Sequence, residues 1–305
     1  MYLIEIAGLK ILFTGDFSRE DDRHLIPAAI PKNTHVDVLI TESTYGVASH
    51  IPRQERENAL MKSVTGILNR GGRALLPVFA LGRAQELLLI LDDYWARHPE
   101  YQRIPIYYAS NLARKCMIVY QTYISAMNDN IKRMFRERIA EAQQHQHQHQ
   151  SSSSTAGENS LERGGPWDFR FIRSLKNLDR FDDVGSCVVL ASPGMLQSGV
   201  SRELLERWAP SDKNGVVITG YSVEGTMARQ LFNEPDHIPA IMGARTASVA
   251  RRGLHASEEK PMVPRRCSVQ EFSFAAHVDG VENQGFIQEV GASVVVSPLS
   301  LKFPP

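Results

Sequence analysis

The sequence predicts an α/β fold with a mainly parallel sheet flanked by helices. From about residue 55 onward, short apolar strands alternate with helical stretches, which is typical of a parallel sheet covered on both faces. The chain has 305 residues, and 43% of them are hydrophobic. A chain of this length and composition can form two domains or one large one.

The first residues predict a hairpin followed by a buried strand. The segments "YLIEIA" and "KILFTG", within residues 2–15, are joined at Gly8. The third segment, "VDVLITES", spans residues 36–43. Short runs rich in β-branched and aromatic residues, bounded by glycine or polar residues, are typical of strands.

The segments that follow alternate between predicted helices and predicted strands. A helical pattern over residues 55–69 ends just before Gly71 and Gly72, and it is followed by the strand "RALLPVFA" and the helix "RAQELLLILDDYWARH". A further long helix is predicted over residues 112–142. The remaining predicted strands are "IPIYYAS", "CVVLASPG" and "GVVITGYS".

Small residues end three of these strands, namely Ser110, Ser192 to Gly194, and Gly220 with Tyr221. Ligands bind at the carboxyl edge of open parallel sheets, and a helix N-terminus there can hold phosphate oxygens. Tight turns explain the same residues equally well, so both interpretations remain open.

Two regions depart from the regular pattern. Residues 143–165 begin with alternating glutamine and histidine, including His145, His147 and His149. We expect a disordered surface insertion rather than a metal site, because nothing around the tract fixes ligand geometry. Residues 243–266, rich in arginine, alanine, serine and proline, predict a long loop.

The charge and the cysteine content argue against several classes of protein. Lysine plus arginine and aspartate plus glutamate both total 34, so any nucleic-acid contact must be local. The three cysteines lack the spacing of a zinc cluster or a disulfide framework. Neither an apolar run of membrane length nor a basic secretory leader is present, so we expect no membrane contact.

Three residues at strand ends could carry chemistry: Asp16 after "ILFTG", Glu42 in "LITESTYG" and His277 in "SFAAHVDG". Each alone has a structural explanation, as a turn cap, a solvated charge or a hydrogen-bonded histidine. Together they belong to a longer series of motifs.

This series is "GDFSREDDRHL", "ESTYG", "RGGRALLPVFALGRAQELLLILDDYW", "VVLASPGMLQSGVSRELLERW", "GYSVEGTMARQ" and "SFAAHVDG". With these motifs the chain resembles the β-CASP branch of the metallo-β-lactamase nucleases. Within that branch it is similar to the endonuclease subunits of cleavage and polyadenylation complexes. The resemblance covers residues 1 to about 296, apart from the two irregular regions.

The resemblance implies a partial αββα metallo-β-lactamase domain interrupted by a β-CASP domain. The expected limits are residues 1–45 for the first metallo-β-lactamase segment, 46–273 for the β-CASP domain and 274–305 for the return. It also implies cleavage of pre-mRNA for 3′-end processing and polyadenylation, in the nucleus. The implied partners are pre-mRNA and the other subunits of the complex.

The resemblance also implies a role for each strand-end residue. Asp16 matches the aspartate that bridges two zinc ions, because a carboxylate offers one oxygen to each metal. Glu42 matches the acidic residue beside the site. His277 matches the histidine that acts with it as proton donor to the leaving oxygen.

The family's main metal motif, H-x-H-x-D-H, and its final V-H-G motif are not found in this sequence. We therefore expect this polypeptide to lack most zinc ligands and to be inactive as a nuclease. Two explanations compete: a fragment of a processing endonuclease, or a noncatalytic β-CASP homologue that acts as an RNA-binding or scaffold subunit. No G-x-S-x-G or G-x-G-x-x-G motif supports a small-molecule enzyme instead.

Overall fold

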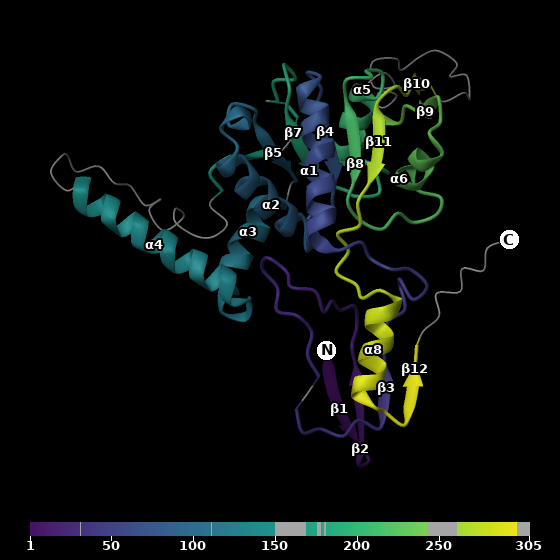
Figure 1. The fold of residues 1–305 in the computed structure, drawn as a ribbon. Coiled ribbons are helices and arrows are strands. Elements are labelled where there is room, and N and C mark those ends of the chain that lie inside the picture. Colours follow the sequence, from purple (N-terminus) through teal and green to yellow (C-terminus); the bar gives the residue numbers. More distant parts are fainter. Residues whose placement is uncertain are drawn as a thin grey trace, which may run out of the picture. The chain divides into compact units, whose positions relative to one another are not determined.

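The computed structural model describes residues 1–30, 32–110, 112–149, 169–175, 178–179, 181–242 and 261–297. The chain divides into two compact units (Figure 1). Unit 1 combines Met1–Pro52 with Ala275–Pro305, and unit 2 is Arg53–Phe274. The limits 46–273 for the β-CASP domain itself remain a prediction.

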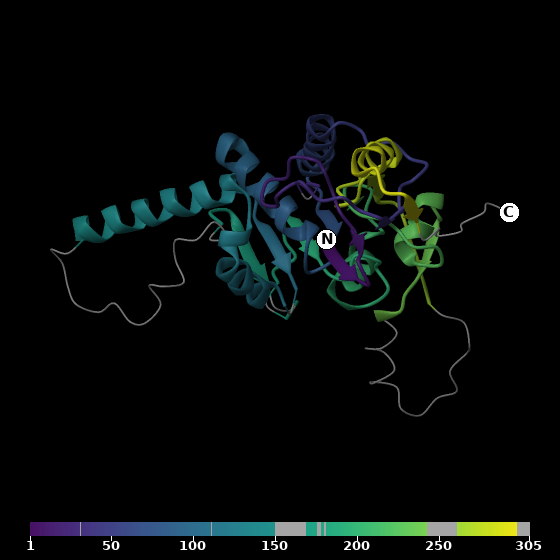
Figure 2. The same ribbon diagram turned by 90° about the horizontal axis from the view of Figure 1, so that it is seen from below.

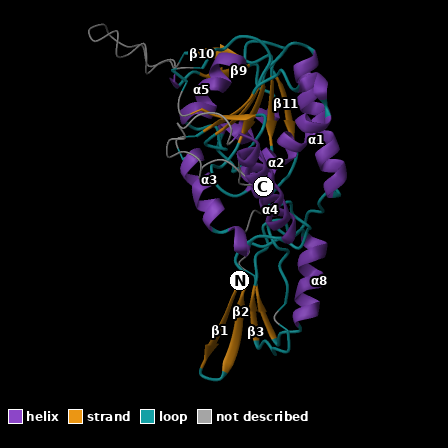
Figure 3. Cartoon of the chain, turned by 90° about the vertical axis from the view of Figure 1, so that its left-hand side faces the viewer, coloured by secondary structure: helices purple, strands orange, loops and turns teal. Residues whose placement is uncertain are grey.

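Unit 1 is a four-stranded sheet with one helix. Its elements are β1 (Tyr2–Ile6), β2 (Leu9–Phe13), β3 (Val38–Ile40), α8 (Gly280–Val290) and β12 (Val294–Val296). The strand order is β1-β2-β3-β12, with β1 antiparallel to β2 and the other neighbours parallel. Figure 3 shows β1, β2 and β3 as one sheet, with α8 in the same unit.

The predicted hairpin is confirmed. Its connection consists of Ala7 and Gly8, which both have positive φ angles, 51° and 80°. Two successive residues in this region make a tight turn whose twist matches that of the paired strands. The turn pairs Ile6 with Leu9 and fixes the register of the hairpin.

The two faces of this sheet have different environments. On one face, Leu12 and Leu39 are buried together with Phe17 and with Phe286 of α8. The residues of the other face follow from the strand register, and we call them the apolar sheet face: Tyr2, Ile4, Ile6, Leu9, Ile11, Phe13, Val38, Ile40, Val294 and Val296. Seven of the ten are exposed to solvent, among them Tyr2 and Ile6.

Unit 2 contains a six-stranded parallel sheet, which confirms the predicted fold class. Its strands are β4 (Ala74–Pro77), β5 (Ile106–Ala109), β6 (Ile172–Leu175), β7 (Val188–Ala191), β8 (Gly215–Ile218) and β11 (Ser268–Glu271). Their order is β11-β8-β4-β7-β5-β6. A separate antiparallel pair joins β9 (His237–Pro239) to β10 (Met262–Pro264).

Helices cover both faces of the larger sheet. The described helices of unit 2 are α1 (Arg53–Asn69), α2 (Arg83–Arg97), α3 (Ala113–Thr122), α4 (Asp129–His149), α5 (Gly199–Trp208) and α6 (Met227–Gln230), with short 3₁₀ turns at Pro99–Tyr101, Ile124–Ala126 and Leu231–Asn233. Leu76 of β4 faces α1 and α2, whereas its neighbour Leu75 faces α5 and α6. Because alternate strand residues point to opposite faces, both cores draw on the same strands.

The prediction of one helix over residues 112–142 is wrong. The chain instead forms α3 and α4, separated by a 3₁₀ turn. The second helix restarts at a polar cap, since the Asn128 side chain accepts a hydrogen bond from the backbone N–H of Ile131 at 3.1 Å. A side chain that caps a helix start marks a true terminus rather than a continuous helix.

The two irregular regions are also partly ordered. Helix α4 continues through His149 and extends away from the rest of unit 2 (Figures 1 and 2), so the prediction of disorder is wrong for residues 143–149. Residues 150–165 lie outside the described residues. The predicted loop 243–266 includes β10 at its end, and residues 243–260 are likewise outside the described part of the chain. Among the described helices, none has the length and apolar content required to cross a bilayer.

Candidate active site

Asp16 and Glu42 follow two neighbouring parallel strands of unit 1. The register of β2 and β3 sets Phe13 opposite Ile40. Asp16 comes three residues after Phe13, and Glu42 comes two residues after Ile40. Parallel strands end at the same edge of a sheet, so this pairing brings both carboxylates to one edge.

The structure brings Asp16, Glu42 and His277 together, with ligating atoms within 4.8 Å of one another. His277 Nδ1 lies 2.6 Å from Glu42 Oε2 and 4.0 Å from Asp16 Oδ1. A carboxylate only accepts hydrogen bonds, so Nδ1 carries the proton of the shorter contact. Nε2 is then the ring nitrogen that remains for other chemistry.

Glu42 is fixed on several sides. Its Oε1 accepts a hydrogen bond from the backbone N–H of Phe17 at 2.8 Å, and its backbone carbonyl accepts one from the Asn283 side chain at 2.7 Å. Asn283 is itself held by the hydroxyl of Thr41 at 3.1 Å. The side chain of Glu42 is only 5% exposed, so the carboxylate has little freedom to turn away from His277.

The pKa of His277 is raised above its ordinary value. The main cause is the hydrogen bond from its ring to Glu42, which favours the charged imidazolium. Partial burial opposes this effect, while the negative charges of Glu42 and Asp16 add to it. The pair therefore keeps a proton available on the ring at a higher pH than a free histidine would.

Asp16 differs from Glu42 in its exposure. Its side chain is 74% exposed, and its carboxylate is free to ligate a cation. Both oxygens of Glu42, in contrast, already accept hydrogen bonds. A catalytic zinc ion normally has three protein ligands plus water, so this cluster alone does not complete a site for two zinc ions.

The small residues at the strand ends of unit 2 act as turn formers. Ser110 Oγ accepts the backbone N–H of Leu112 at 3.2 Å. The carbonyl of Pro193 accepts the hydroxyl of Ser201 at 2.6 Å, and the peptide bond before Pro193 is cis. These contacts give Ser110 and the turn at Pro193 a structural role, and the phosphate interpretation stays a prediction.

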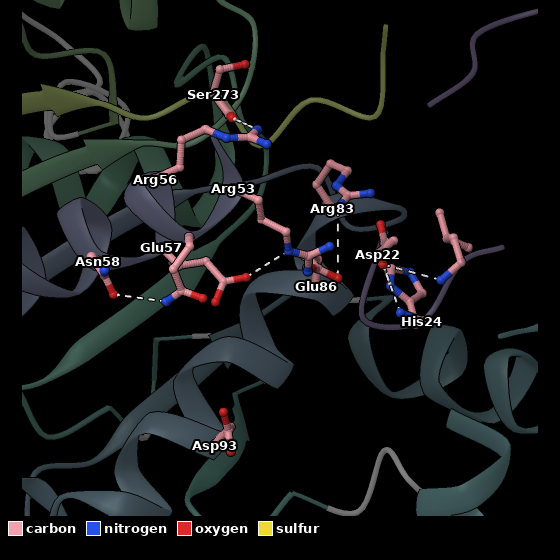
Figure 4. Close-up of polar contacts among 12 residues, drawn as sticks. Asp22, His24, Arg53, Arg56, Glu57, Asn58, Arg83, Glu86, Asp93 and Ser273 are labelled. Atoms are coloured by element: carbon pink, nitrogen blue, oxygen red, sulfur yellow. Dashed lines mark hydrogen bonds and ion pairs between the residues drawn. The ribbon is translucent and has the colours of Figure 1, made fainter. Parts of the chain in front are cut away.

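A buried ion-pair cluster joins α1 to α2 within unit 2 (Figure 4). Arg53 Nε lies 2.9 Å from Glu57 Oε1, and its Nη2 pairs with Glu86 Oε1. Arg83 Nη2 lies 3.9 Å from the second oxygen of Glu86. Glu86 is almost fully buried and pairs with arginines from both helices, so we assign this cluster a structural role.

A second contact in Figure 4 joins the two ends of unit 2. Arg56, in the first turn of α1, donates from Nη1 to the carbonyl of Ser273 at 2.6 Å. Its guanidinium also lies 5.6 Å from the ring centroid of Phe274. The chain therefore enters and leaves unit 2 at neighbouring points, although these residues are 217 positions apart.

Sequence reasoning missed several residues around the site, notably Tyr45, His50, Asp279 and Asn283. Asp279 could have been found, because an aspartate before a helical stretch is a common N-cap, and its Oδ1 accepts the backbone N–H of Glu282 at 2.8 Å. No local pattern marks the other three. Their contacts join residues more than 200 positions apart.

Comparison with known proteins agrees with this fold. A family model described as the Beta-Casp domain matches residues 84–231, from α2 to the turn after α6. The chain therefore contains a β-CASP domain over these residues. The matched residues lie within unit 2.

Particular relatives are similar over nearly the whole chain. The chain is 73% identical to Endoribonuclease ysh-1 of Neurospora crassa and 70% identical to Endoribonuclease YSH1 of Gibberella zeae. It is 51% identical to Endoribonuclease ysh1 of Schizosaccharomyces pombe. Each alignment spans 296 residues and 97% of this chain, but only 33%, 34% and 33% of the respective relatives. The chain thus spans about a third of the length of these proteins.

Proposed function

We propose that this chain is part of a zinc-dependent endoribonuclease that cleaves pre-mRNA for 3′-end processing and polyadenylation. The observation that carries the proposal is the cluster of Asp16, Glu42 and His277 at one sheet edge. The identity of 73% to a protein named as an endoribonuclease supports RNA as the substrate.

His277 is the proposed proton donor. Glu42 binds Nδ1 at 2.6 Å and so fixes the ring with Nε2 available. When a phosphodiester bond breaks, the departing sugar oxygen requires a proton, and an imidazolium supported by a carboxylate can supply it. The hydrogen bond to Glu42 raises the pKa of His277, which favours the protonated ring.

Asp16 is the proposed metal ligand, because its exposed carboxylate can offer an oxygen to each of two zinc ions. The cluster alone has too few ligands, so we propose that the remaining ones belong to the longer protein. The 305-residue polypeptide itself should then bind zinc weakly and should not cleave RNA.

The remaining parts of the proposal concern the setting of the reaction. The substrate would be pre-mRNA, the protein partners would be the other subunits of the cleavage and polyadenylation complex, and the location would be the nucleus. The names of the relatives support RNA as the substrate, and the motif resemblance supports pre-mRNA, the complex subunits and the nucleus.

The alternative is a noncatalytic β-CASP homologue that binds RNA or serves as a scaffold subunit. The limited number of ligands in the cluster favours it. The two functions differ in one respect that can be measured. A processing nuclease needs the carboxylate of Asp16 and the ring of His277, whereas a scaffold needs neither.

The test uses a full-length relative with substitutions at the positions that match Asp16 and His277. Both Asp16→Asn and His277→Gln should lower the cleavage rate, the latter by about 10²- to 10⁴-fold. A substrate with a sulfur leaving group needs no proton, so it should restore cleavage by the His277→Gln protein only. If both variants cleave ordinary RNA at the unaltered rate, the proposal fails.

A parallel measurement concerns the chain itself. We expect the purified 305-residue polypeptide to contain less than one zinc ion per molecule and to leave pre-mRNA intact. Two tightly bound zinc ions together with unaided cleavage would overturn the statement that further ligands are required.

A further inference from the structure

Two segments of unit 1 that are far apart in sequence run together beside the candidate active site. Residues 45–50 follow Glu42, and residues 277–280 lead into α8. Tyr45 pairs with Asp279 in an isolated parallel bridge, and Gly280 N–H donates to the carbonyl of Ala48 at 3.0 Å. The fit is close, because a Cβ atom on Gly280 would lie only 2.5 Å from the carbonyl oxygen of Gly46.

His50 makes two bonds across this junction. Its ring Nε2 lies 3.0 Å from the carbonyl oxygen of His277, and its backbone N–H donates to Asp279 Oδ2 at 2.9 Å. A carbonyl oxygen only accepts, so the His50 ring must carry a proton on Nε2. His50 thus bonds the backbone carbonyl of His277 and the side-chain carboxylate of Asp279, the residues on either side of Val278.

The ring of His50 is itself held by an aromatic contact. It packs edge-on against Tyr45, with ring centroids 4.9 Å apart. The same tyrosine ring lies 5.9 Å from the ring of His277. Tyr45 therefore limits the movement of both histidines, and His50 cannot shift without disturbing a contact of His277.

The other side of the same peptide is held independently. Val278 N–H donates to the carbonyl of Phe17 at 2.8 Å, and Phe17 N–H donates to Glu42 Oε1 at 2.8 Å. The peptide between His277 and Val278 is consequently fixed through both its carbonyl and its N–H. Of these two restraints, only the carbonyl bond depends on a side chain that can be exchanged.

We propose that His50 is a positioning residue for His277. By bonding the His277 carbonyl and the Asp279 carboxylate, it sets the backbone from which the His277 ring reaches Glu42. The positioning follows from contacts within unit 1, whereas its importance for RNA cleavage rests on the function proposed above. His50 has no direct part in the chemistry, since its bonds are to backbone and to Asp279.

The first test observes the His277 ring by NMR in the 305-residue chain, with ¹⁵N-labelled histidine. A proton shared between Nδ1 and a carboxylate gives a downfield resonance, and His277→Gln identifies it. His50→Phe keeps an aromatic ring beside Tyr45 but has no donor, so this resonance should shift or disappear. His50→Gln can place an amide donor where Nε2 was, so it should preserve the resonance.

Two controls separate positioning from a general loss of structure. His50→Asn is shorter and should behave like the phenylalanine variant, which provides a second test if that variant fails to fold. His35→Gln exchanges another histidine of unit 1, whose side chain is 72% exposed, and should leave the resonance unchanged. The proposal is overturned if the phenylalanine and asparagine variants keep the resonance, or if glutamine fails to preserve it.

The second test measures cleavage by a full-length relative substituted at the matching position. The phenylalanine variant should lose about 10- to 100-fold in kcat with little change in KM, and glutamine should restore it, because misplacement of a reacting group mainly affects the chemical step. If the unaltered relative does not cleave RNA, the proposed function fails while the NMR result still decides the role of His50. If the relative cleaves RNA and all His50 variants are equally active, the positioning role is wrong.

Discussion

At the residue scale, the ionisation of His277 depends on one neighbour. The hydrogen bond to Glu42 Oε2 is the largest cause of its raised pKa. The Glu42→Gln substitution keeps the shape of the side chain but removes its charge. We expect the titration midpoint of His277 in the folded chain, followed by NMR, to fall in this variant. An unchanged midpoint would contradict the assignment of Glu42 as the cause.

The raised pKa of His277 also predicts how the stability of the folded chain depends on pH. The pKa of His277 is higher in the folded than in the unfolded chain, so its stabilising contribution is complete below about pH 6.5. It is lost as the pH rises through the folded pKa. The free energy of unfolding should therefore decrease over that interval in the unaltered chain, and the decrease should be smaller in Glu42→Gln.

The three residues of the cluster could be found from the sequence because each stands at a strand end within a recognisable motif. Asp16 follows "ILFTG" and Glu42 stands in "ESTYG". His50 could not be found in this way. Its partner, the His277 carbonyl, is 227 residues away and is a backbone atom, which no sequence pattern specifies.

At the element scale, α8 illustrates a helix that depends on its surroundings. It contains Gly280 and Gly285, which lower helix propensity, and no helix was predicted there. It forms because Asp279 caps it and Phe286 is buried against the sheet. In contrast, α2 was predicted at nearly its observed limits, because its apolar residues repeat with helical spacing.

The two glycines of α8 should respond oppositely to alanine. At Gly280 the added Cβ would lie 2.5 Å from a backbone oxygen of Gly46, so Gly280→Ala should destabilise unit 1 by about 1–3 kcal/mol. At Gly285 no atom lies within 4 Å, so Gly285→Ala should stabilise the helix by up to about 1 kcal/mol. Hydrogen exchange of unit 1 amides measures both effects. Equal effects of the two substitutions would show that the close approach at Gly280 is unimportant.

At the scale of the whole molecule, the two units differ in how completely they bury apolar residues. Unit 2 has a core on each face of its sheet. Unit 1 has one small core and presents the apolar sheet face, with Ile6 and Tyr2 exposed. A contiguous apolar surface of this kind favours association.

Substitutions on the two faces of the hairpin should therefore differ. Ile6→Thr, on the apolar sheet face, should reduce the binding of a hydrophobic dye and the tendency to self-associate, and it should change stability by less than about 0.5 kcal/mol. Leu12→Thr, on the buried face, should cost about 2–4 kcal/mol. Dye fluorescence and chemical denaturation distinguish them, and equal effects would contradict the assignment of faces.

The contact between Arg56 and Ser273 has a consequence for how the candidate site is assembled during folding. Glu42 and His277 are 235 residues apart, and closing a flexible loop of that length costs about 5 kcal/mol of chain entropy. Once unit 2 has folded, Arg56 and Ser273 lie next to each other, so the flexible loop that remains to be closed is much shorter. Glu42 is synthesised before unit 2 and His277 after it, so their contact can form only once all of unit 2 has been made. A substitution inside unit 2 that impairs its folding can therefore prevent this contact without changing either residue.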